Sequence, residues 1–389
     1  MRIAHVIDVT CRDYAPTTLA LAGDLIGATS DLSHHVLVID GPCGDNDLRQ
    51  ALNVDSVQTV RAPANHSMLQ RRALRQALDR SSYDVIHAWS PASGAAAISS
   101  ARHVPCLITV THAPAPGNIS WFTRRRLRAG RVRVAVINES LQQSVTDARI
   151  AARDMRVVRP GVDAARIPHD QRRALRIGWG VADDATRVVM LLGDPPNRAD
   201  AAVAGLCVGL AHETGRRLRL LMSPRARGLR SAKQMAARIG RADRLIVDSV
   251  ADTPWIALAG CDAALMLGGG SGRGAGAAGG WGGLPALWAM AAGVPVIAES
   301  AAFLDGVPAD DVAENLIIAA GVRATARRLC QWHDEPDSAR STVRRAQRTV
   351  AEQYSVQQWA ASVKAEYDIL VCHSPGSPAT AATVPAAGT

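Results

Sequence analysis

Lysine is almost absent from this chain of 389 residues, in which Lys233 and Lys364 stand beside 42 arginines. Any phosphate contact must therefore be made almost entirely by guanidinium groups, which bind phosphate oxygens as a two-pronged fork. Aromatic residues are also scarce, with eight Trp, four Tyr and two Phe. Because the interleaved aromatics that stack on bases are missing, nucleic-acid binding is not expected.

The sequence also lacks the patterns of disulfide, zinc and membrane proteins. Its seven cysteines contain no C-x-x-C pair and are odd in number, which indicates neither a disulfide framework nor a thiolate metal site. No apolar run approaches the roughly 20 residues of a membrane-spanning helix. The opening MRIAHVIDV has no signal-peptide hydrophobic region and is typical of a strand. We expect a soluble, cytoplasmic protein without a metal.

What the chain does contain is a repeated alternation of strand-length apolar runs and longer amphipathic segments. Continuous Val, Ile and Leu runs are typical of parallel strands buried on both faces, so the fold class is α/β with doubly wound parallel sheets. The length is comfortable for two domains. We predict Rossmann-like domains over residues 1–175 and 176–353, a closing helix over 354–372 that packs back on the first domain, and a disordered tail over 373–389.

The positive charge is concentrated in the first half. Residues 1–180 contain 23 Arg and 15 acidic residues, whereas residues 181–389 contain 21 basic and 20 acidic residues. The segment Trp121–Arg133 alone has six arginines, no acid and two leading aromatics. This pattern predicts contact with an anionic membrane surface or an anionic acceptor, with a solvated helix face as the alternative. The residues assigned to that contact are Trp121, Arg124, Arg125, Arg126 and Arg128.

Residues 268–283 include ten glycines in sixteen positions, between a predicted strand and a predicted helix. Glycine lets the backbone approach a ligand closely, and N–H groups at a helix amino end bind anions. The segment is therefore either a phosphate-binding loop or a low-complexity insertion. Gly270, Gly272 and Ala275 only approximate a dinucleotide fingerprint, and no acid suited to a ribose follows, which speaks against an oxidoreductase.

Five segments together resemble retaining glycosyltransferases of family 4. They are YDVIHAWSP (83–91), VPCLITVTHAP (104–114), VVRPGVD (157–163), GGLPALWAMAAGVPVIA (282–298) and YSVQQWAASVKAEYDIL (354–370). The resemblance covers about 370 residues in the family's order. It implies the GT-B architecture, two Rossmann-like domains with a cleft between them.

The same resemblance implies an activity: transfer of a sugar from a nucleotide sugar, such as a UDP- or GDP-sugar, to a glycan, lipid or other acceptor. The anomeric configuration would be retained, and neither a cofactor nor a metal would be needed. His112, after a predicted strand, would be the catalytic residue facing the acceptor. His87 has a similar setting, on the acceptor or membrane side, although its counterpart in the family is usually structural. The donor would contact Gly193, Arg198, Arg225, Gly282, Gly283, Leu284 and Trp288.

The sequence departs from the family at the donor site. Alignment on AMAAGVP places Gly280 and Trp288 where the family has two glutamates, and Asp194 where it has a basic residue. Trp288 would either stack on the donor or fill the space that the carboxylate leaves. The alternative function is therefore a non-catalytic GT-B scaffold or binding protein. A carboxylate supplied from elsewhere, such as Glu299, would restore the catalytic interpretation. For an enzyme, peripheral contact with the inner face of the membrane would follow from the basic first domain.

Overall fold

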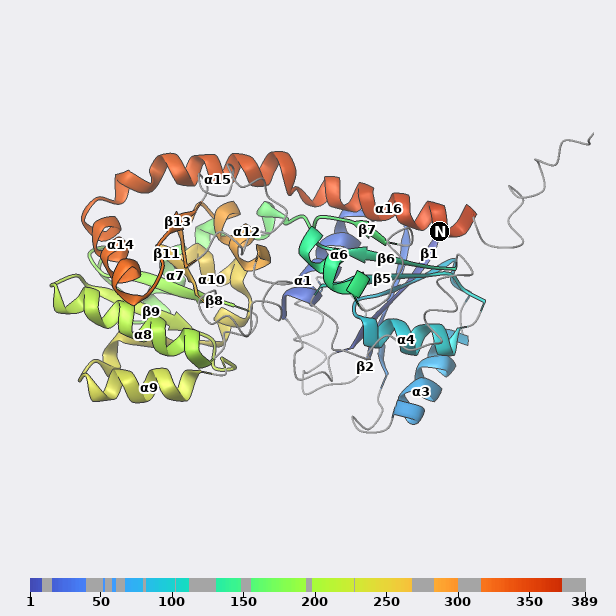
Figure 1. Ribbon diagram of the computed structural model, residues 1–389, viewed down its shortest axis with the longest axis horizontal. Coiled ribbons are helices and arrows are strands. Elements are labelled where there is room, and N and C mark those ends of the chain that lie inside the picture. The colour runs from blue at the N-terminus through green and yellow to red at the C-terminus, as the bar shows by residue number, and fades with distance from the viewer. Residues whose placement is uncertain are drawn as a thin grey trace, which may run out of the picture. The chain divides into compact units, whose positions relative to one another are not determined.

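The computed structural model forms two compact units (Figure 1). Unit 1 comprises Met1–Tyr14, Thr18–Arg159 and Val356–Thr389, and unit 2 comprises Ala15–Thr17 and Pro160–Ser355. The structure describes residues 1–8, 16–39, 52, 58–60, 67–79, 82–101, 103–111, 131–147, 155–193, 198–226, 228–267, 283–299 and 316–372.

Unit 1 is built on a parallel sheet with the strand order β3-β2-β1-β4-β5-β6-β7. Its strands are β1 (Arg2–Asp8), β2 (Ser33–Ile39), β3 (Gln58–Val60), β4 (Val85–Ala88), β5 (Cys106–Val110), β6 (Val132–Val136) and β7 (Met155–Val157). Its helices are α1 (Pro16–Ala28), α3 (Ser67–Asp79), α4 (Pro91–Ser100), α6 (Glu139–Asp147) and α16 (Val356–Cys372). The apolar runs that predicted buried parallel strands form this sheet.

The two faces of the unit 1 sheet differ in chemistry. Because successive side chains of a strand point to opposite faces, Ile86 and Ala88 join the apolar core formed with α3, α4 and α6, whereas His87 points the other way. On that second face, His87 meets Tyr367 and Arg133 forms an ion pair with Glu366, both partners lying on α16. Lys364 of α16 also pairs with Asp31. The closing helix α16 lies along unit 1 (Figure 1), and these three polar contacts hold it there.

Unit 2 repeats the plan with the strand order β10-β9-β8-β11-β12-β13, again parallel. Its strands are β8 (Arg187–Leu192), β9 (Leu218–Met222), β10 (Leu245–Val247), β11 (Ala263–Met266), β12 (Val296–Ala298) and β13 (Ile317–Ile318). Its helices are α7 (Arg172–Gly178), α8 (Arg198–Glu213), α9 (Leu229–Arg238), α10 (Pro254–Gly260), α12 (Gly283–Ala291), α14 (Val322–Asp334) and α15 (Arg340–Gln353). The predicted doubly wound α/β class is confirmed in both units.

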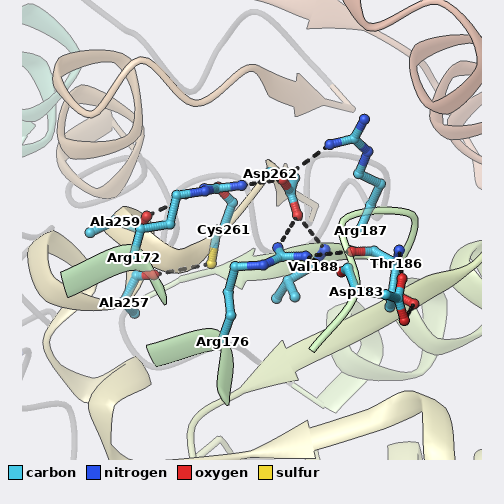
Figure 2. A network of polar contacts seen from close by, with 10 residues as sticks. All are labelled: Arg172, Arg176, Asp183, Thr186, Arg187, Val188, Ala257, Ala259, Cys261 and Asp262. Carbon is cyan, nitrogen blue, oxygen red and sulfur yellow. Dashed lines mark hydrogen bonds and ion pairs between the residues drawn. The ribbon is translucent and has the colours of Figure 1, made fainter. Parts of the chain in front are cut away.

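The division between the units falls at residue 159, earlier than the sequence-based boundary at 175. Helix α7, which a boundary at 175 would divide, is held in unit 2 by a buried carboxylate (Figure 2). Asp262 is 4% exposed and accepts hydrogen bonds from Arg176 Nη1 at 2.7 Å, Arg172 Nη2 at 2.5 Å and the Val188 N–H at 2.8 Å. Because these two arginines belong to α7, the segment that precedes β8 is held in unit 2.

Candidate functional site

The carboxyl edge of the unit 2 sheet is the place where its topology favours a ligand. From β8 the chain runs outward through β9 and β10, then returns to place β11 on the other side of β8. In open α/β sheets, ligands bind at such a reversal, beyond the carboxyl ends of the strands. The carboxyl ends of β8 and β11, at Leu192 and Met266, border this position. Gly193 directly follows β8 with a φ of 152°, a conformation that side-chain-bearing residues rarely adopt.

An arginine and a carboxylate are paired beside the end of β9. Arg225 Nε lies 3.5 Å from Asp252 Oδ2, and the Arg225 N–H donates to Ser223 Oγ at 2.9 Å. The Ser223 hydroxyl in turn donates to Asp252. Burial raises the pKa of Asp252, while the Ser223 hydrogen bond and the Arg225 charge oppose that rise. The Arg225 side chain is 53% exposed, so this pair presents a positioned guanidinium at the same edge.

Neither Ser223 nor Asp252 was selected from the sequence. The signal that was available is the DSVADTP run at 248–254, in which Asp248 caps a short 3-10 helix over Ser249–Asp252. That helix presents Asp252 toward the loop after β9. Sequence spacing alone did not show that these two loops meet.

Helix α12 begins with the two predicted donor residues Gly283 and Leu284. The Leu284 side chain is buried, so any ligand contact there falls to backbone N–H groups at the positive end of the helix. Trp288, one helical turn later, is fully buried, and its ring centroid lies 5.5 Å from that of Trp255. Arg166 covers Trp255, with 4.7 Å between the guanidinium carbon and the ring centroid. Of the two sequence-based interpretations, this packing favours Trp288 as a filler of space.

Glu299 also reaches this edge. It directly follows β12, and its N–H donates to the Met266 carbonyl at 3.0 Å, which joins the ends of β12 and β11. Its charge acts on Cys207 of α8, whose thiol pKa is raised to about 12, mainly by burial and then by Glu299. The Glu299 carboxylate therefore lies near α8 at the carboxyl edge, although Glu299 is at neither of the positions, 280 and 288, where the family has glutamate.

His87 lies in the interior of unit 1. It is fully buried, with 2.6 Å between its Nδ1 and the Tyr367 hydroxyl and 2.7 Å between its Nε2 and the Thr109 hydroxyl. Burial, followed by the charge of His34, lowers the pKa of His87 to about 3. With both ring nitrogens bonded inside the protein, His87 is placed for packing, and not for contact with an acceptor or a membrane.

Several predicted residues lie outside the described part of the chain. The backbone of Arg198 begins α8, but its side chain is not described. Of the basic segment, the described Arg133 is committed to Glu366. Among the described residues, no three His, Cys, Asp or Glu side chains gather as metal ligands would, and no helix is long and apolar enough to cross a bilayer. Outside the description are His112, Trp121, Arg124, Arg125, Arg126, Arg128, Gly280 and Gly282.

Comparison with known proteins supports the family resemblance seen in the sequence. Residues 21–166 match the family model described as Glycosyltransferase Family 4, which bears out the sequence-based resemblance for the first part of the chain. No curated protein matches the chain by sequence. The comparisons support a glycosyltransferase.

Solved structures match along nearly the whole chain. A glycosyltransferase from Rickettsia africae has a TM-score of 0.69 at 12% identity, covering 95% of this chain and 98% of that one. HepE from Anabaena, in complex with UDP and glucose, has a TM-score of 0.68 at 15% identity, covering 95% and 99%. Sucrose-phosphate synthase from Thermosynechococcus elongatus has a TM-score of 0.63 at 16% identity, covering 95% and 99%. These likenesses confirm the GT-B fold.

Proposed function

We propose that the protein transfers a sugar from a UDP- or GDP-sugar to a glycan, lipid or other acceptor, with retention of anomeric configuration. The observation that carries the proposal is the carboxyl edge of the unit 2 sheet. There the amino end of α12 and the half-exposed Arg225 follow strands on the two sides of β8, the strand at which the topology reverses. The family match over residues 21–166 and the nucleotide and nucleotide sugar bound by HepE support it.

The chemistry follows from those charges. As the bond between the sugar C1 and the donor diphosphate breaks, the electron pair passes to the diphosphate, and an acceptor oxygen forms the new bond to C1. The α12 amino end, Arg225 and Arg198 stabilise the departing diphosphate. The acceptor hydroxyl passes its proton to the departing diphosphate oxygen, which has taken the electron pair, and His112 is the residue we assign to face that hydroxyl. No cofactor or metal is required in this scheme, and Glu299 supplies the carboxylate missing at positions 280 and 288.

Binding and turnover of the donor test the proposal together. The full chain is titrated with UDP and GDP by calorimetry, then incubated with UDP- and GDP-sugars while nucleotide release is followed. We expect binding in the micromolar-to-millimolar range and slow release without acceptor. Binding without any release or transfer would identify the non-catalytic scaffold instead, and no binding of either nucleotide would reject both. When an acceptor is found, the anomeric configuration of the product tests retention.

The Arg225→Ala variant tests whether the donor binds beside the end of β9. It removes the guanidinium at the end of β9 and should weaken nucleotide binding by about tenfold, the size of one lost charge-assisted contact. Arg238→Ala, at the end of α9, is the matched control because it removes an arginine of the same unit at no predicted ligand position. If both variants weakened nucleotide binding equally, binding would depend only on the net charge of the protein.

The basic first half suggests an anionic acceptor or membrane surface. Liposome co-sedimentation with and without anionic lipid tests this part separately. Replacement of Arg124, Arg125, Arg126 and Arg128 by glutamine should abolish binding to anionic vesicles if the Trp121–Arg133 segment carries it. Unchanged binding would place the anionic surface elsewhere.

A further inference from the structure

A pocket lies at the amino edge of the unit 2 sheet, opposite the proposed donor position. Arg187 is the first residue of β8, Asp262 directly precedes β11 and Pro295 directly precedes β12, and all three line the pocket. Its volume is about 500 Å³, within the range of small-molecule sites. Since the proposed donor position is at the carboxyl ends of these strands, the length of the strands separates the two sites.

The pocket wall is strongly basic. Four arginines and His169 line it, and Asp262 is the sole acidic lining residue in the described part of the chain. That carboxylate is already engaged by Arg176, which lies outside the lining, and by Arg172. The lining arginines are Arg172, Arg187, Arg340 and Arg344. The pocket therefore retains a surplus of positive charge.

One face of α15 supplies half of these arginines. Arg340, Val343, Arg344 and Gln347 are spaced i, i+3, i+4 and i+7 and all line the pocket. Two arginines four residues apart on a helix repel each other, and an anion between them relieves that repulsion. Arg340 is paired with Asp337 at 2.9 Å, whereas Arg344 has no ion-pair partner among the described residues.

The rest of the wall is closely built. Gly293, with a φ of 72°, brings its backbone against Gln347, so that an added Cβ would lie 2.8 Å from Gln347 Nε2. Arg172 donates to the carbonyl oxygens of Ala259 and Cys261, which holds its guanidinium in place (Figure 2). Arg187 is held more loosely, with 3.6 Å between its Nη1 and Asp262 Oδ1. Positioned amide and guanidinium donors around a recess suit a ligand rich in oxygen atoms.

We propose that this pocket binds a small molecule bearing phosphate, with at least two negative charges, at a site separate from that of the sugar donor. Guanidinium forks match phosphate oxygens in geometry, and the surplus of positive charge favours an anion. The ligand contacts Arg172 and Arg187, and both of these arginines pair with Asp262. The same carboxylate holds α7 to the start of β8. The site goes beyond the transferase reaction, which does not use it.

Calorimetry with inorganic pyrophosphate as the probe tests the site on the full chain. Arg344→Glu reverses a charge on the pocket face of α15. Arg348→Glu, the control, reverses another exposed charge of the same helix outside the lining. Both positions are on the surface, so folding should be preserved, which thermal melting checks. We expect Arg344→Glu to weaken binding by about tenfold or more and Arg348→Glu to change it by less than about threefold. Saturation with UDP should leave pyrophosphate binding in place.

Three results would overturn the proposal. The first is that the wild-type protein binds no pyrophosphate. The second is that both variants lose affinity equally, which would reveal a general charge effect. Displacement of pyrophosphate by UDP is the third, because it would locate the probe at the nucleotide position. The comparison of the two variants needs no nucleotide binding, so it stands whether or not the donor proposal succeeds.

Discussion

The Nδ1 atom of His87 and the hydroxyl oxygen of Tyr367 lie 2.6 Å apart although 280 residues separate them in the chain. Both side chains are fully buried. This contact joins the centre of the unit 1 sheet to α16, which the chain adds only after it has completed unit 2. The last helix of the chain, α16, therefore completes the fold of unit 1.

Tyr367→Phe should destabilise unit 1. It removes the hydroxyl and leaves the buried His87 Nδ1 without a partner, at a cost of about 1–3 kcal/mol. Urea unfolding followed by fluorescence measures the loss. Gln357→Ala, on the exposed side of α16, is the control and should change stability by less than about 0.5 kcal/mol. A neutral Tyr367→Phe variant would show that the contact contributes nothing net.

Stability should fall as the pH is lowered from neutral. Burial lowers the pKa of His87 to about 3 and that of His5 well below its usual value. Unfolded histidine titrates near 6.5, so between about pH 6.5 and 3 the unfolded chain binds protons that the folded protein does not. The stabilisation is complete above this window and is lost progressively through it.

Unfolding free energies measured at several pH values between 7 and 4 test this, within the range where the protein stays folded. His87→Gln should flatten the dependence, whereas His103→Gln, at an exposed position, should leave it unchanged. An identical slope in the His87 variant and the wild type would contradict the assignment.

Asp262→Asn should be among the most destabilising single changes in unit 2. It leaves the buried Arg176 without its charge partner, and breaking one side of a buried pair costs about 3–5 kcal/mol. Asp337→Asn provides the comparison, because its ion pair with Arg340 is exposed on both sides and should cost less than about 1 kcal/mol. Similar denaturation midpoints for the two variants would refute a structural role for the Asp262 network.

Substitutions at Trp288 separate packing from ligand contact. Trp288→Ala should cost about 3–5 kcal/mol because it empties a buried site against Trp255. Trp288→Phe should cost much less, since it keeps an aromatic ring and removes a buried N–H that has no partner among the described residues. An alanine variant of native stability that loses nucleotide binding would instead show that the ring contacts the donor.

The order of strands and helices could be predicted because it depends on local apolar patterning. The apolar runs that alternate with amphipathic segments include 187–192, 218–222 and 263–266, and these form β8, β9 and β11. The ion pair between Arg225 and Asp252 could not be predicted, because it forms only where the turns after β9 and β10 come together. The same holds for Asp262, whose neighbours Arg172 and Arg176 are about 90 residues away.

The sequence by itself determined the α/β class, the GT-B fold and the scarcity of lysine that leaves phosphate contacts to arginine. Tertiary structure decided which polar residues are available for chemistry. His87 and Trp288 are covered by α16 and α10, and Arg133 is neutralised by Glu366. Arg344 and Arg187 gather in a pocket that no local pattern indicates. Strand periodicity is a property of neighbouring residues, whereas burial and net charge at a point depend on every segment that packs around it.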